Sequence, residues 1–238
     1  MPFSLPQSVT LSRIFLALAI FAVALLAANL LVGLTIGDFG EASRAYQHSF
    51  HQYEALTDAS APRTELDAAK VSRDEAMFAL RTQRSGFWLH IWLGIAAALM
   101  TLLVNCISFT YFIGTNRWSR EVVDAFGLPE ELAKRSQALK RKTFPWSIIG
   151  ISLILVMASL GAACDPATLN PDAADWVEYH WGLAMVGVAV IAACFFFQVS
   201  TIGKNFELIN EILQAAEAER ERRKQAREQA ESSTAAAE

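Results

Sequence analysis

Four long stretches of the 238-residue sequence contain no Asp, Glu, Lys or Arg. They cover residues 14–36, 87–113, 144–164 and 181–203, and each is long enough to cross the apolar core of a bilayer. All 20 basic and 24 acidic residues therefore lie between or beyond these stretches. This pattern excludes a soluble enzyme, a secreted disulfide scaffold and a free nucleic-acid binder.

Catalytic signatures are also missing. The sequence has no Walker motif, no H-E-x-x-H, no G-x-S-x-G and no kinase or receptor signature. The intramembrane charged residue that is typical of proton-coupled transporters is missing too. The three cysteines, Cys106, Cys164 and Cys194, show no C-x-x-C spacing and are interpreted as small buried apolar residues. These absences favour a protein without enzymatic activity.

The first stretch resembles a secretory signal peptide but is too long for one. The apolar part of a signal peptide covers about 7–15 residues, whereas residues 14–36 are uncharged throughout. We therefore expect residues 1–36 to form the N-terminus and an uncleaved first membrane helix.

The distribution of Lys and Arg orients the predicted helices, because cytoplasmic connections are rich in basic residues. Residues 114–143 contain seven basic residues, and the tail at 204–238 contains six. The connection at 165–180 contains none and has four acidic residues. We therefore predict that both termini are cytoplasmic, in a membrane such as the bacterial inner membrane, and that 37–86 and 165–180 lie outside.

The outer connection, residues 37–86, has the pattern of two helices rather than of a loop. Apolar side chains recur at helical spacing in both halves, and Pro62 lies in the break between them, with Ser60 as the expected N-cap of the second helix. We predict an extramembrane stalk of two antiparallel helices whose apolar side chains face each other or another chain. These side chains are Ala42, Tyr46, Phe50, Tyr53 and Leu56, followed by Leu66, Ala69, Ala76, Met77 and Leu80.

The cytoplasmic segments also have amphipathic patterns. Residues 116–126 carry apolar and aromatic side chains on one face, which is typical of a short helix lying in the headgroup region. Gly127 is expected to end this helix. Residues 204–238 continue the fourth stretch as an amphipathic helix that gives way to a polar end.

Three consecutive cations, Lys140, Arg141 and Lys142, precede the third uncharged stretch. Most simply they determine topology, and the alternative is a site for anionic lipid. The predicted fold class is all-α: a polytopic membrane protein with a four-helix transmembrane bundle, an extramembrane two-helix stalk and interfacial cytoplasmic helices.

The second and fourth stretches begin alike, with a histidine followed closely by tryptophan and glycine. The histidines are His90 and His180, and a duplicated helical hairpin would explain the likeness. Small and polar residues recur along both stretches, and such residues prefer the bundle interior to lipid. We therefore expect His90 and His180 to point toward a common space that Asn29 can also reach. The two sets are His90, Gly94, Ala97, Thr101, Asn105 and Ser108, and His180, Ala184, Gly187, Cys194, Gln198 and Thr201.

Three interpretations of His90 and His180 stay open. They are interfacial residues with one solvated nitrogen, ligands of haem iron or, with further ligands, of copper or zinc, or a pH sensor. For haem b, the positions of Gly94 and Gly187 would leave room beside the porphyrin.

A second histidine pair, His48 and His51, lies three residues apart in the predicted stalk, with Glu54 three residues further on. Its two imidazoles would share one helix face, which is the arrangement of a weak transition-metal site. The alternative is a pair of solvated side chains.

Three functions are consistent with these patterns. The first is a non-enzymatic subunit or scaffold of a membrane assembly. The second is a small electron-transfer or metal-binding protein that holds haem b or copper at His90 and His180. The third is a sensor without a recognisable output domain. The expected partners are the lipid bilayer and either a second copy of the chain or other membrane-protein subunits, and no nucleic acid is expected.

Overall fold

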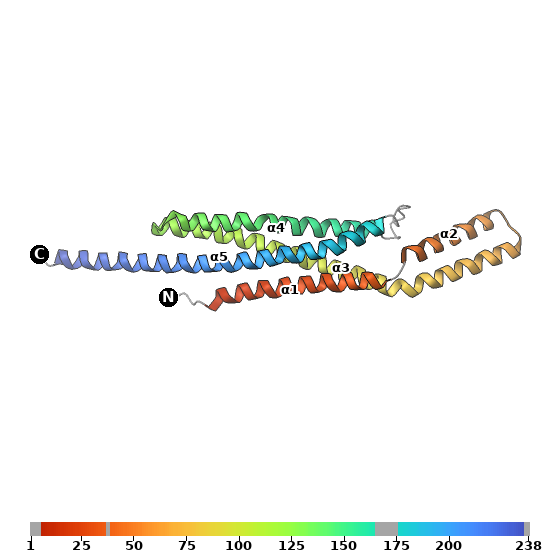
Figure 1. Cartoon of the computed structure of the whole chain (residues 1–238), viewed down its shortest axis with the longest axis horizontal. Coiled ribbons are helices and arrows are strands. Elements are labelled where there is room, and N and C mark those ends of the chain that lie inside the picture. The colour runs from red at the N-terminus through yellow and green to blue at the C-terminus, as the bar shows by residue number, and fades with distance from the viewer. Residues whose placement is uncertain (1–5, 37–38, 165–175, 236–238) are drawn as a thin grey trace. The chain divides into compact units, whose positions relative to one another are not determined.

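The computed structural model describes residues 6–36, 39–164 and 176–235. These residues form five α-helices and no β-strand, so the predicted all-α class is confirmed. Most of the acidic connection at 165–180 lies outside the described residues. The helices are α1 (Pro6–Thr35), α2 (Phe39–Asp58), α3 (Arg63–Phe126), α4 (Glu130–Ala163) and α5 (Trp176–Ala235) (Figure 1).

Four of these helices, α1, α3, α4 and α5, are long and apolar enough to span a membrane. Their surfaces are apolar as well: Ile20, Leu99 and Phe196 are each more than 60% exposed. Such surfaces are unfavourable in water and favourable against lipid tails. The four predicted membrane helices are thus confirmed, and the structure is that of a membrane protein.

The longest helix, α3, joins segments that the sequence pattern predicts as separate helices. Its 64 residues include the second half of the hairpin, the uncharged stretch 87–113 and the segment 116–126. The segment 116–126 is therefore the end of α3 rather than a short separate helix. As predicted, the helix ends at Gly127, whose φ of 64° is the left-handed conformation that glycine adopts readily.

The described residues belong to two compact units, which are treated one at a time. The first unit comprises the described parts of residues 1–19, 102–151 and 192–238. At one end of it, α3, α4 and α5 bury an apolar cluster that consists of Val123, Leu132, Ala133, Leu208 and Ile212.

Buried hydrogen bonds between uncharged side chains join α3 and α5 in the first unit. Nε2 of Gln198 donates to Oδ1 of Asn105 at 2.9 Å. Nδ2 of Asn205 donates to the Tyr111 hydroxyl at 3.1 Å and to Oγ1 of Thr115 at 3.2 Å. Gln198 and Asn105, two of the polar positions predicted to face the interior, are fully buried, and so is Asn205.

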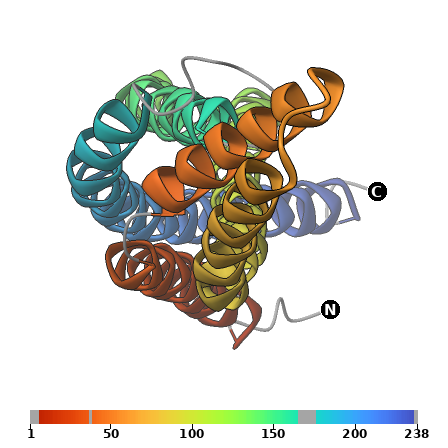
Figure 2. The same cartoon turned by 90° about the vertical axis from the view of Figure 1, so that its right-hand side faces the viewer.

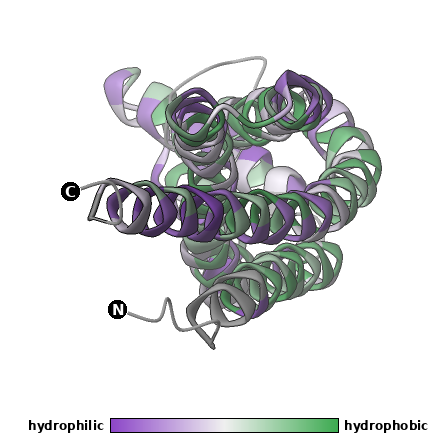
Figure 3. Cartoon of the chain, turned by 90° about the vertical axis from the view of Figure 1, so that its left-hand side faces the viewer, coloured by the Kyte–Doolittle hydropathy of each residue, from purple (hydrophilic) through white to green (hydrophobic). Residues whose placement is uncertain are grey.

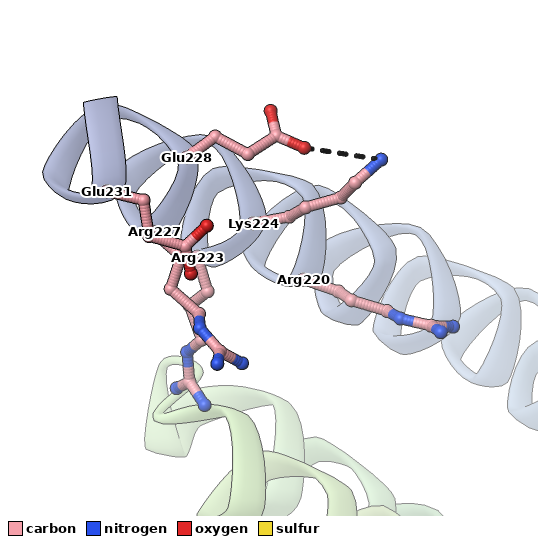
Figure 4. A pocket seen from close by; sticks show the side chains of 6 residues that line it. All are labelled: Arg220, Arg223, Lys224, Arg227, Glu228 and Glu231. Carbon is pink, nitrogen blue, oxygen red and sulfur yellow. Dashed lines mark ion pairs between the residues drawn. The ribbon is translucent and has the colours of Figure 1, made fainter. Parts of the chain in front are cut away.

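The C-terminal end of α5 is hydrophilic, as the purple ribbon of Figure 3 shows. Along this end Arg223 points toward the end of α3 (Figure 4), where it donates to the carbonyl oxygens of Phe126 at 2.8 Å and Ala125 at 3.5 Å. A cation is favourable there because the last carbonyl groups of a helix carry partial negative charge. Glu219 holds the guanidinium from one turn earlier, at 2.9 Å.

The second unit comprises the described parts of residues 20–101 and 152–191. It contains the predicted hairpin, in which α2 is joined to the first part of α3 (Figures 1 and 2). Pro62 caps α3, because its carbonyl oxygen accepts from Glu65 and Leu66. The predicted N-cap role of Ser60 is wrong, since its φ of 51° places it in the turn that ends α2.

The aromatic face of α2 contacts α3. The guanidinium of Arg73 lies 4.6 Å from the centre of the Tyr53 ring, a cation–π contact. A hydrogen bond to Asp74, and then the charge of that carboxylate, raise the pKa of Arg73 above its ordinary value. Tyr53 of α2 therefore faces the sister helix, as in one of the two predicted arrangements.

Candidate metal site

His90 of α3 and His180 of α5 lie side by side in the second unit. Their ring centroids are 6.3 Å apart, and the ring planes are inclined at 78°. Both side chains are half-buried. The structure thus brings together the two histidines that the likeness between the second and fourth stretches singles out.

A backbone carbonyl fixes the orientation of the His90 ring. Nδ1 of His90 lies 3.1 Å from the carbonyl oxygen of Asn29 on α1. A carbonyl oxygen only accepts, so Nδ1 carries the proton and the neutral imidazole keeps its lone pair on Nε2. Metal-binding histidines have this arrangement, in which the second ring nitrogen donates to a carbonyl or carboxylate. Asn29 reaches the pair as predicted, but through its backbone.

The His180 ring has a buried nitrogen, Nδ1, close to the backbone of Met157. Nδ1 of His180 makes no hydrogen bond of good geometry within the described residues, although the backbone of Met157 is close enough to interact with the ring. A ring nitrogen held by a backbone carbonyl leaves the other ring nitrogen, Nε2, available to a ligand.

Each histidine ring packs against a glycine of a neighbouring helix. A Cβ atom added to Gly33 of α1 would lie 2.9 Å from Cε1 of His90, and one added to Gly161 of α4 would lie 3.1 Å from Cε1 of His180. Neither glycine is singled out by the sequence pattern. Gly33 lies one helical turn beyond Asn29, and that spacing is the signal that could have identified it.

Side chains of neighbouring helices lie beside Gly94 and Gly187 in the described structure, and haem binding there stays a prediction. A Cβ atom at Gly94 would lie 3.3 Å from Nδ2 of Asn29, and one at Gly187 would lie 2.5 Å from Sδ of Met157. These glycines let α1 approach α3 and α4 approach α5. They therefore serve helix packing in the described structure.

His48 and His51 lie on α2 with both side chains exposed. Nδ1 of His51 is 3.5 Å from a carboxylate oxygen of Glu54. No group of three or more His, Cys, Asp or Glu side chains suited to a metal ion occurs within the described residues. Metal binding by His48 and His51 therefore stays a prediction, because the described residues provide no third ligand beside them.

Two shallow hollows lie on the described surface of the first unit. One runs along the charged end of α5 (Figure 4) and is bounded by Arg220, Arg223, Lys224, Arg227, Glu228 and Glu231. The other lies on α3 and is bounded by Cys106, Ile107, Thr110, Tyr111, Gly114 and Thr115. Neither contains a histidine, so neither extends the candidate site.

No protein-family model, curated protein or solved structure gives a match to the chain. The functional argument therefore rests on the geometry of the described residues.

Proposed function

We propose that the protein is a membrane metalloprotein in which His90 and His180 hold one redox-active metal ion, with copper as the ion and electron transfer as the function. The observation that carries this proposal is the contact between the two imidazoles, whose centroids are 6.3 Å apart. Bound copper would supply a one-electron couple. The chain supplies the two nitrogen ligands and a largely apolar surrounding.

The separation of the rings suits a single ion between them. Two imidazole nitrogens that each lie about 2 Å from a metal ion put their ring centroids roughly 6 Å apart. The observed separation is close to this value. His90 is also oriented in advance by the Asn29 carbonyl, so little rearrangement is needed on its side of the site.

Copper fits these two ligands better than zinc or haem iron does. A structural zinc site takes four protein ligands, and the described residues contain no group of three suitable side chains. Haem needs a planar opening, but Asn29 and Met157 fill the positions beside Gly94 and Gly187. Imidazole is a good ligand for copper, and copper(I) accepts two nitrogen ligands in a line.

The scaffold and sensor hypotheses stay predictions. The scaffold hypothesis is supported by the lack of catalytic motifs, and the sensor hypothesis by the continuity of α5 from its apolar part to its charged end. No contact among the described residues favours either of them over a metal site.

The test is copper binding by the detergent-purified chain, measured by elemental analysis after incubation with copper(I). We expect close to one copper ion per chain, and loss of most of it in both His90→Ala and His180→Ala. The comparison variant is His48→Ala combined with His51→Ala, which removes two exposed imidazoles and should leave the copper ion held by His90 and His180 in place. Full retention of copper in both single variants would overturn the proposal. An absorption spectrum showing that all of the bound metal is haem iron would also overturn it.

A further inference from the structure

We propose that Lys140, Arg141 and Lys142 on α4 bind the headgroups of anionic phospholipids. This inference concerns the first unit and does not rest on the metal site. It is supported by the pairing of charges along α4, by the surroundings of the three cations, and by the charges that flank the other apolar stretches.

The basic residues of α4 divide into a paired group and an unpaired group. Lys134 pairs with Glu130 at 3.2 Å, and Arg135 pairs with Glu211 at 2.8 Å. The three consecutive cations at 140–142 form no ion pair with any acidic side chain of the described residues. Three adjacent positive charges repel one another unless an anion neutralises them.

The cations lie where α4 passes into its apolar part. Phe144 begins the uncharged stretch, and Ile148 and Ile149 follow it with more than 40% of their surfaces exposed. Side chains that face lipid tails so soon after the cations place the cations at headgroup depth. Phosphate groups of anionic lipids occur at that depth and attract basic clusters next to a membrane helix.

Aromatic rings stabilise this boundary. Nζ of Lys140 lies 5.7 Å from the centre of the Phe144 ring. That ring in turn stacks on Phe109 of α3, with centroids 4.3 Å apart. The contact holds the Lys140 ammonium next to the apolar surface, so a lipid headgroup bound there can extend its acyl chains along α4.

The charges that flank the other apolar stretches have the same sign. In the first unit, the charged residue next to each uncharged stretch is basic: Arg13, Arg117, Lys142 and Lys204. Of these, Arg117 is paired, with Glu121 at 2.8 Å. Charge complementarity therefore favours an anionic lipid over a zwitterionic one.

The experiment measures lipid retention by native mass spectrometry after the detergent-solubilised chain is mixed with equal amounts of phosphatidylglycerol and phosphatidylcholine. We expect the wild-type chain to retain phosphatidylglycerol preferentially. Replacing all three cations by Gln should remove that preference, with roughly a fivefold loss of affinity for each cation. The matched control is Arg220→Gln, Lys224→Gln and Arg227→Gln, which removes the same charge from the polar end of α5.

Two further measurements keep the proposal testable if the triple variant does not insert correctly. Each single Gln variant at 140, 141 and 142 should show a partial loss. In the wild-type chain, added salt should weaken the preference, because salt screens charges in water. Equal retention of the two lipids by the wild-type chain would overturn the proposal. So would a loss of phosphatidylglycerol preference in the α5 control as large as the loss in the triple variant at 140–142.

Discussion

Nδ1 of His90 donates a hydrogen bond to the backbone carbonyl of Asn29 at 3.1 Å, so α1 sets the orientation of an imidazole on α3. A backbone carbonyl within α1 cannot be removed by a side-chain substitution. The effect of this contact is therefore best tested through the neighbouring glycine, which determines how closely the ring approaches α1.

Gly33→Ala should weaken copper binding and destabilise the chain. Its Cβ atom would come within 2.9 Å of Cε1 of His90, and overpacking of this kind costs about 1–3 kcal/mol. The measurements are copper affinity and thermal unfolding in detergent. Gly182→Ala is the control, since no described atom beyond its chain neighbours and its own helix backbone lies within 4 Å of the Cβ position there. Equal copper affinities in the wild type and Gly33→Ala would count against the placement of the His90 ring.

Gly161→Ala tests the other imidazole in the same way. A Cβ atom at Gly161 would lie 3.1 Å from Cε1 of His180, so the ring has to turn or shift. We expect a smaller loss of copper affinity than in Gly33→Ala, because the added Cβ atom would lie 3.1 Å from the His180 ring and not 2.9 Å, as it would from the His90 ring. A larger loss of copper affinity in Gly161→Ala than in Gly33→Ala would contradict this expectation.

Asn205→Leu should destabilise the first unit. The substitution removes the donor to the Tyr111 hydroxyl and to Oγ1 of Thr115. Hydrogen bonds between membrane helices contribute about 0.6–2 kcal/mol, and reversible unfolding in mixed micelles should show a loss of that size. The control is Ser200→Leu, an exposed position on the same helix. No loss in Asn205→Leu would show that these bonds do not hold α3 and α5 together.

Arg223→Gln should loosen the end of α3. The guanidinium donates to the carbonyl oxygens of Ala125 and Phe126, and the loss of a cation at a helix C-terminus corresponds to about a two- to fivefold change in local opening. Amide hydrogen exchange at residues 125–128 is the measurement. Arg227→Gln serves as the control, and equal exchange in both variants would contradict the capping role.

The membrane helices and the histidine pair were predictable because both depend on local pattern. Charge-free stretches of more than 20 residues indicate membrane helices directly. The small and polar residues around His90 and His180 indicate which faces turn inward, and Thr101, Asn105, Ser108 and Gln198 are indeed fully buried.

The remaining features depend on how helices pack, which a single sequence does not specify. The continuity of α3 through 114–116 and the contact of Gly33 with the His90 ring are examples. The contact beside Gly94 is a further example, because the side chain that lies there comes from Asn29 on another helix. A duplicated hairpin also stays a prediction, since no contact in the described residues tests it.

The most direct test of the metal site is an X-ray absorption spectrum at the copper edge of the copper-loaded wild-type chain. The proposed site predicts two imidazole nitrogens at about 2 Å from copper, with the multiple-scattering signal of the rings, and loss of that signal in His180→Ala. A spectrum dominated by sulfur ligands, from Cys106, Cys164 or Cys194, or by solvent oxygen alone, would contradict copper binding by His90 and His180.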